Sequence, residues 1–198
     1  MAFPPRLLVV IGPSGAGKSS VVRELDRRRA VVVRPTWTTR PPRQDELDGS
    51  LEHRFVSDEE FDRLVVTGFF CRTGAITGLA YRYGLPAFVP HEGGPPDAVI
   101  LRAPYVRSLA RLVPGSVVYQ IEDRPDQMAR RLRARGCPPS ELDARIRDNI
   151  AESTAGHLVA RRIFVNDGTR GQLVDTVTEA VAVDFARSSD AAAALVAS

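Results

Sequence analysis

Long hydrophobic runs and cysteine are scarce in this sequence. No apolar run approaches the roughly 20 residues that a membrane-spanning helix needs, so we expect no membrane partner. The two cysteines, Cys71 and Cys137, have neither metal-ligand spacing nor the number that a disulfide framework requires. The first residues have no basic head followed by a small-residue cleavage site, so we expect a cytoplasmic protein with reduced thiols.

Lysine is rarer still, because Lys18 is the only one and arginine supplies the other basic side chains. The net charge of +3 could indicate nucleic-acid binding. However, many arginines lie beside acidic residues, and aromatic and basic residues do not alternate as they do in single-strand binders. The planar arginine group suits bidentate contact with phosphate oxygens. We therefore expect small phosphate ligands and no nucleic-acid partner.

The chain of 198 residues is 43% hydrophobic and 26% charged, which fits one globular domain. Apolar segments of strand length alternate with segments of helical period, a pattern that predicts an α/β fold with a parallel sheet. The predicted strands are 6–11, 30–34, 98–101, 116–121 and 162–165. The predicted helices are 17–29, 104–112, 124–135, 140–155 and 170–186.

Residues 35–95 interrupt this alternation with Gly, Pro, Arg and aromatic residues. Ser57 and Glu60 form a capping box, which predicts one short helix there. We interpret 35–95 as an acceptor-binding insertion in a domain of residues 1–187 whose core is 1–34 and 96–187. The short insertion 136–139 lies between two Arg-rich helices and predicts a lid at about 133–146. The Ala- and Ser-rich tail, 188–198, is predicted to be disordered.

The strongest motif is Gly12-Pro13-Ser14-Gly15-Ala16-Gly17-Lys18-Ser19, which matches G-x-x-x-x-G-K-[ST] and is followed by Ser20. It lies directly after a predicted strand and opens a predicted helix. Its glycines allow the backbone to wrap around phosphates with N–H groups pointing inward, at the positive end of the new helix. Lys18 is expected to contact the β- and γ-phosphates of ATP, and the Ser19 hydroxyl to bind Mg²⁺.

Further motifs resemble the guanylate kinase family. The stretch 36–43, with Thr38-Thr39-Arg40, is similar to the family's T-T-R-x-P-R stretch, and Phe55-Val56-Ser57 and Tyr83-Gly84 resemble later family segments. The resemblance runs from residue 7 to about 186. It implies a P-loop NTPase fold of three α/β/α layers around a parallel five-stranded core sheet. It also implies a kinase that moves the γ-phosphoryl group of MgATP onto the phosphate of GMP or a related nucleotide.

The resemblance assigns roles residue by residue. Arg40, Arg43 and Tyr83 are expected to hold the acceptor phosphate, and His53 stands where the family has a phosphate-binding tyrosine. Thr36 keeps a hydroxyl on the base side. The remaining expected contacts are the lid arginines over the ATP phosphates and a residue of the adenine-side loop: Arg131, Arg135, Arg145 and Asn166.

The base-recognition residues depart from the family pattern. Arg72 aligns with the glutamate that accepts hydrogen bonds from guanine, and 101–104 replace a pair of aspartates with a segment that contains Arg102. An arginine can only donate, so a buried arginine against guanine N–H groups would leave donors unpaired. Arg72 and Arg102 suit a second anionic group on the acceptor, as in ribose 1,5-bisphosphate phosphokinases, which also lack these residues.

Three functions therefore remain open. The first is a kinase for GMP or a related nucleoside monophosphate, and the second is a kinase for a bisphosphorylated sugar or another phosphorylated metabolite. The third is a non-catalytic binding module on the same fold, which the intact phosphate motif disfavours because such modules have degraded motifs. The sequence predicts a small phosphorylated acceptor as the partner, and it is compatible with a monomer or a homodimer.

Overall fold

The structure is a computed structural model of the whole chain. It describes residues 7–43, 46–47, 49–75, 81–87, 94–134 and 136–196, with only the backbone described at 125–126, 128 and 186–196. The strands are β1 (Leu7–Ile11), β2 (Val32–Val33), β3 (Thr36–Thr38), β4 (His53–Phe55), β5 (Phe70–Ala75), β6 (Arg82–Pro86), β7 (Asp97–Ile100), β8 (Val117–Asp123) and β9 (Arg162–Asn166). The helices are α1 (Lys18–Arg27), α2 (Asp58–Val66), α3 (Ala103–Leu112), α4 (Pro125–Ala134), α5 (Pro139–His157) and α6 (Arg170–Val196).

The core is a five-stranded sheet in the order β2-β7-β1-β8-β9, and every adjacent pair of strands is parallel. The central strand β1 is completely buried, as the continuous apolar run predicts for a parallel strand that is covered on both faces. The predicted five-stranded parallel sheet is therefore confirmed. Because the strands are parallel, the segments that follow them emerge at one edge of the sheet, where α/β proteins bind ligands.

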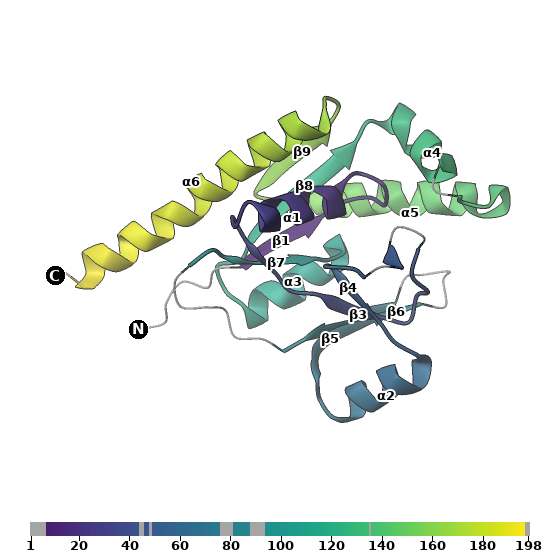
Figure 1. Ribbon diagram of the computed structural model, residues 1–198, viewed down its shortest axis with the longest axis horizontal. Coiled ribbons are helices and arrows are strands. Elements are labelled where there is room, and N and C mark those ends of the chain that lie inside the picture. Colours follow the sequence, from purple (N-terminus) through teal and green to yellow (C-terminus); the bar gives the residue numbers. More distant parts are fainter. Residues whose placement is uncertain are drawn as a thin grey trace.

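Helices cover both faces of this sheet, which gives three layers (Figure 1). On one face α1 and α6 pack against the sheet through an apolar cluster that includes Val22, Leu25 and Val177. On the other face α3 and α5 pack through a second cluster that includes Val106 and Leu109. These two apolar layers fix the sheet edge at which the phosphate-binding loop and the ends of the other strands meet.

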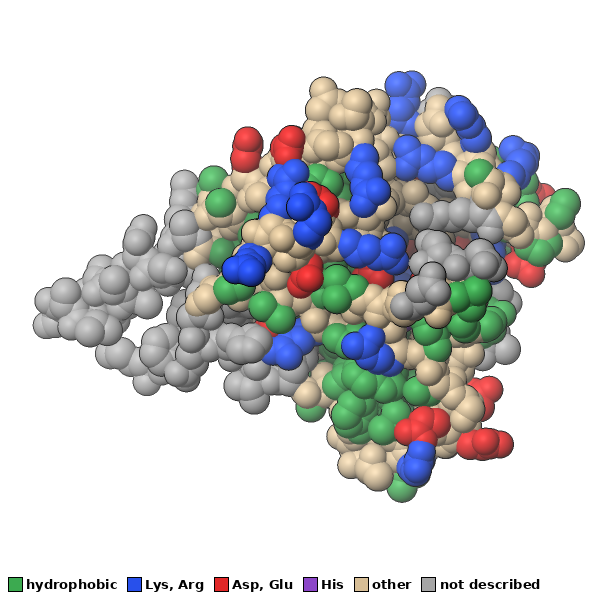
Figure 2. All heavy atoms as spheres, in the orientation of Figure 1, with side chains coloured by type: hydrophobic (Ala, Val, Ile, Leu, Met, Phe, Trp, Pro, Cys, Tyr) green, Lys and Arg blue, Asp and Glu red, His purple; other side chains and the backbone are tan. Residues whose placement is uncertain are grey.

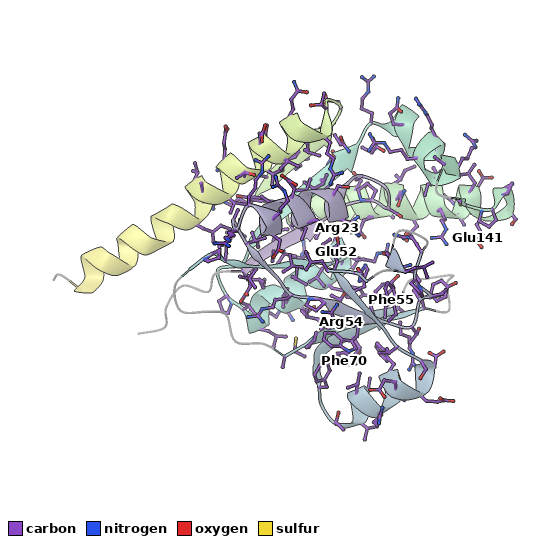
Figure 3. The ribbon with its side chains drawn as sticks, viewed as in Figure 1. Arg23, Glu52, Arg54, Phe55, Phe70 and Glu141 are labelled. Carbon is purple, nitrogen blue, oxygen red and sulfur yellow. The ribbon has the colours of Figure 1, made fainter. Side chains whose placement is uncertain are left out.

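The insertion forms a second sheet, in the order β4-β3-β6-β5, with α2 beside it (Figure 1). Only α2 was predicted, and its cap is confirmed because the Ser57 side chain accepts a hydrogen bond from the Glu60 backbone N–H. The bidentate ion pair of Arg23 on α1 with Glu52 links the core to the insertion, with Nε–Oε1 at 2.8 Å and Nη2–Oε2 at 3.2 Å (Figure 3).

Two segments near the end of the chain bear on the predictions. The predicted lid corresponds to the end of α4, a turn at Gly136 with φ +77°, and the start of α5, so it is two helix ends joined by a tight connection. Of the tail predicted to be disordered, 188–198, the described part belongs to α6, which continues to Val196. Alanine has the highest helix propensity, and the Ala-rich run lets the helix continue past the packed core.

Candidate active site

The ends of the core strands and the second sheet enclose a cavity of about 420 Å³. It holds residues from both halves of the predicted site. The predicted residues that line it are Gly12, Ser14, Gly15, Gly17, Lys18, Ser19, Ser20, Thr36, Arg40, Arg43, His53, Tyr83, Arg102 and Arg145. Figure 2 shows that basic side chains gather over the part of the surface where α1 and α4 lie, which favours anionic ligands in that region.

The phosphate-binding loop, residues 12–19 (the P-loop), depends on glycine at its start. Gly12 has φ +131°, and a Cβ at this position would lie 2.0 Å from the carbonyl oxygen of Ile121, so only glycine fits. Gly17, with φ +103°, precedes the first helical residue of α1. The helix therefore begins at Lys18, and its positive end faces the cavity, as an anion site requires.

Lys18 folds back over the P-loop. Its ammonium group donates to the carbonyl oxygens of Gly12 at 2.6 Å and Pro13 at 2.8 Å. These bonds hold the positive charge of Lys18 against the start of the P-loop, because the carbonyl of Gly12 lies six residues before it in the sequence. An ammonium group positioned in this way can stabilise charge on a transferring phosphoryl group.

Two asparagines from distant segments support the P-loop. Asn149 on α5 accepts a hydrogen bond from the Ser14 backbone N–H at 2.8 Å and donates one to the Ser14 carbonyl at 3.1 Å. Asn149 is only 1% exposed. Asn166, predicted for the adenine side, instead donates to the Ala16 carbonyl at 2.9 Å. It is not among the residues that line the cavity. The structure therefore gives Asn166 a supporting contact with the loop.

The lid arginines occupy different environments. Arg145 lines the cavity and is paired with Glu141 one turn before it, with Nη2–Oε2 at 3.0 Å. Arg131 is not among the residues that line the cavity, and its Nη1 donates to the Gly15 carbonyl of the P-loop at 3.4 Å. Its Nε lies 3.2 Å from the buried Asp123 carboxylate at the end of β8. Predicted Arg135 lies outside the described residues.

The predicted phosphate-binding arginines of the insertion are organised around Glu46. Arg40 Nη2 donates to a Glu46 carboxylate oxygen at 2.9 Å, and the Arg43 backbone N–H donates to the other oxygen at 2.8 Å. The Arg40 guanidinium also lies over the Phe55 ring, 5.2 Å from its centroid. Glu46 is 5% exposed, and the backbone and the two arginines hold the pKa of its carboxyl below its usual range despite burial.

His53, Thr36 and Tyr83 form the wall beside these arginines. His53 Nδ1 lies 2.9 Å from Thr36 Oγ1, and the His53 and Tyr83 ring centroids are 6.4 Å apart. Burial, assisted by the positive charge of Arg40, lowers the pKa of His53 to about 4. His53 therefore lines the cavity beside Arg40 and Arg43, and it is neutral near pH 7.

The two arginines that prompted a second anion subsite lie apart. Arg102 lines the cavity, but its guanidinium is paired with Asp148 at 2.7 Å and Glu152 at 3.1 Å. Arg72 is not among the residues that line the large cavity: it is exposed on β5 and borders a small adjoining hollow of about 30 Å³, which shares Thr36 and Tyr83 with that cavity. The structure therefore does not bring Arg72 and Arg102 together as one anion site. The pairing of β5 with β6 fixes the position of Arg72, and two carboxylates hold the guanidinium of Arg102.

A magnesium ion would depend mainly on the nucleotide. Ser19 lines the cavity as predicted, and the described part of the chain contains no cluster of three or more His, Cys, Asp or Glu side chains that could hold a metal. Mg²⁺ in such sites keeps several waters and is bound through substrate phosphates with few protein ligands. One hydroxyl beside a phosphate loop fits this mode.

No helix within the described residues is long and apolar enough to cross a membrane.

Sequence reasoning missed several residues that shape the site. Glu46 follows Arg43 by three residues, so an acid within an arginine-rich loop was a usable signal. Asn149 gave no signal, because its partner Ser14 lies 135 residues away. The same holds for Glu152, which accepts from the Ala103 backbone N–H at 2.7 Å and from Arg102.

Comparison with known proteins identifies the family. The guanylate kinase family model matches residues 4–84. A guanylate kinase of Thermobifida fusca is 38% identical over 70% of this chain and 72% of its own length, and one of Frankia casuarinae is 34% identical over 84% and 92%. The crystal structure of guanylate kinase from Anaplasma phagocytophilum superposes with a TM-score of 0.66 at 19% identity, over 93% of this chain and 88% of that one, which supports the fold. The chain is therefore an ATP-dependent P-loop kinase that belongs to the guanylate kinase family.

Proposed function

We propose that this kinase transfers the γ-phosphoryl group of MgATP to the phosphate of a nucleoside monophosphate, with GMP as the foremost acceptor. One observation carries the proposal. A single cavity is lined both by the P-loop, with Lys18 and Ser19, and by Arg40 and Arg43 of the insertion. A donor and an acceptor phosphate in one cavity can react by direct transfer, which needs alignment of the two groups more than covalent help from the protein.

The proposed mechanism rests on fixed positive charge. The P-loop N–H groups and Lys18 hold the donor phosphates, and Arg145 adds charge from the lid side of the cavity. When bound, Mg²⁺ supplies Lewis-acid polarisation of the donor phosphate oxygens, with Ser19 as its protein ligand. Arg40 and Arg43 orient the acceptor. No general base is needed, because the acceptor phosphate is already ionised near neutral pH.

Charge in the cavity favours a nucleotide over a bisphosphorylated sugar. A sugar bisphosphate needs a second cationic subsite, and Arg102 was the candidate within this cavity. Its charge faces both Asp148 and Glu152, so these three side chains together carry a net charge of −1. A second phosphate at that position would be repelled rather than bound.

The exposure of Arg72 also removes an objection to GMP. The objection assumed a buried arginine facing the N–H donors of guanine, which would leave unpaired groups. Arg72 is exposed on β5, so its donors can bond to water and are not left unpaired beside a base. The names of the curated relatives further support GMP as the acceptor.

A coupled ADP-release assay with MgATP tests the proposal. GMP, dGMP, AMP, CMP, UMP and ribose 1,5-bisphosphate would be compared as acceptors at equal concentrations. The Lys18→Ala variant, purified identically, is the control for kinases carried over from the expression host. GMP-dependent ADP release by the wild type alone is expected. Release with the bisphosphate and not with any nucleotide would refute the proposal, and silence with every acceptor would favour a binding module.

A further inference from the structure

His53 stands at the start of β4 in the acceptor half of the cavity, held by a short chain of hydrogen bonds. Its Nδ1 lies 2.9 Å from Thr36 Oγ1, and the same Thr36 hydroxyl donates to the Glu52 carbonyl oxygen at 3.3 Å. Its own backbone N–H donates to Ser50 Oγ at 3.1 Å. The ring is thus fixed at Nδ1, which leaves Nε2 as the nitrogen for a ligand in the cavity.

The Thr36 hydroxyl determines which ring nitrogen carries the proton. A hydroxyl has one proton to donate, and the Glu52 carbonyl can only accept. Both contacts are hydrogen bonds only if Thr36 donates to Glu52 and accepts from His53 Nδ1–H. The neutral ring then has a bare Nε2. Phosphate oxygens are acceptors, so a bare Nε2 cannot bind them, whereas a protonated Nε2 can.

We propose that His53 binds the acceptor's phosphate as an imidazolium, so that acceptor binding takes up one proton. This inference rests on the proposed function, because it takes the acceptor to end in a phosphate group. It assigns to this chain a property that a phenol or hydroxyl donor at the same place would not have. A hydroxyl donates to phosphate without a change of protonation, whereas the ring of His53 can do so while Thr36 keeps its bond to Glu52 only after it gains a proton.

The charged groups around His53 explain why it is neutral without a ligand and charged with one. Arg40 and Arg43 from the loop after β3 disfavour the imidazolium, and Glu46 and Glu52 favour it. Burial has the largest effect, and together with the arginines it holds the pKa at about 4. A bound phosphate dianion would add two negative charges next to both arginines and the ring. It would offset the arginines and raise the pKa of His53 toward neutrality.

Neutral neighbours complete the environment. Tyr83 on β6 and Phe55 on β4 face the imidazole at centroid distances of 6.4 and 6.1 Å. Thr36 on β3 is hydrogen-bonded to it.

Because acceptor binding takes up a proton, the affinity for the acceptor should fall as pH rises. The fall should reach up to tenfold per pH unit between the pKa values of His53 in the free and bound states.

Histidine NMR on the wild-type protein tests the proposal. The donor half would first be filled with MgADP, and the acceptor half would then be saturated with sulfate or, separately, with GMP. Sulfate is a dianion that takes up no proton near neutral pH, so any new proton belongs to the protein. The His53→Gln variant identifies the His53 signals. Calorimetry in buffers of different ionisation enthalpy would measure proton uptake, with His53→Gln as the control because its amide donates without protonation.

We expect His53 to remain neutral from pH 5.5 to 8 before ligand is added and to titrate within that range when sulfate or GMP is bound. Proton uptake should approach one per sulfate bound for the wild type and be near zero for His53→Gln. Bound ligand with His53 still neutral, or no sulfate binding in the presence of MgADP, would overturn the proposal. A sulfate response without GMP binding would uphold the proton uptake and instead refute GMP as acceptor. GMP turnover with a neutral His53 would leave the proposed function standing alone.

Discussion

Asn149 is the residue whose replacement tests the structure of the donor site most sharply. Its amide makes two hydrogen bonds with the Ser14 backbone, at 2.8 and 3.1 Å, and no charge is involved. The Asn149→Ala substitution removes both bonds without changing the formal charge of the cavity. The P-loop then loses the two bonds that tie it to this side chain of α5, so its phosphate-binding geometry should loosen.

The size of the effect follows from the burial of the two groups. A hydrogen bond contributes roughly 0.5–1.5 kcal/mol, and a buried group left unpaired costs about 1–3 kcal/mol. Asn149 is buried, but Ser14 is partly accessible, so water can satisfy part of what is lost. We therefore expect the substitution to cost about 2 kcal/mol of the free energy that holds the loop in place. If all of this cost falls on MgATP binding, the affinity for MgATP decreases roughly 30-fold, at 1.36 kcal/mol per tenfold.

The assay is steady-state kinetics with each substrate varied in turn, together with thermal unfolding. The KM for MgATP should rise about 10- to 30-fold while the acceptor KM changes less than about twofold, and the melting temperature should fall by about 4–8 °C. Thr154→Ala on the same helix is the matched control, because its exposed hydroxyl bonds only to the Ile150 carbonyl. An unchanged MgATP KM in Asn149→Ala would refute the reasoning, and an equal rise in both KM values would indicate general unfolding instead.

Three further substitutions probe the donor site, the acceptor site and the core. Lys18→Ala should reduce kcat by roughly 10³-fold or more in the ADP-release assay, and a near-normal rate would rule out its proposed role. Arg40→Ala should raise the acceptor KM about 10- to 100-fold with little change for MgATP, because charge-assisted hydrogen bonds are lost; the reverse pattern would misplace the acceptor. Arg162 and then Tyr119 hold the pKa of Asp184 at about 2, so this stabilisation is complete above about pH 4 and is lost as pH falls through about 2. Asp184→Asn should lower the free energy of unfolding at pH 7 by about 1–3 kcal/mol and flatten its dependence on acid pH. Denaturant titrations of both proteins at pH 7, 4 and 2.5 would measure this, and equal free energies of unfolding at pH 7 would contradict it.

The core of the fold could be predicted because its signals are local. Continuous apolar runs of strand length mark buried parallel strands, and the motif at 12–19 is a contiguous loop with its own geometric demands. The capping box at Ser57 was predicted for the same reason, since donor and acceptor lie three residues apart. Such patterns are set by chain neighbours, so one sequence is enough to find them.

The second sheet and the supports of the site could not be predicted in this way. The strands of that sheet are short and irregularly spaced, and β5 shifts register between Phe70 and Arg72. The side of a strand on which a residue lies depends on this register, so the alignment of Arg72 with a base-reading position did not determine its exposure. The pairing of Arg102 with Asp148 and Glu152 joins segments about 50 residues apart, and only the folded chain brings them together.

Direct identification of the product is the measurement that tests the central claim. The wild-type protein and its Lys18→Ala variant would be incubated with GMP and MgATP that carries a labelled γ-phosphate, and the nucleotides would then be separated by chromatography. The account predicts labelled GDP, formed in step with ADP, from the wild type and not from the variant. Label that stays in ATP, or appears only as free phosphate, would contradict transfer between the two halves of the cavity.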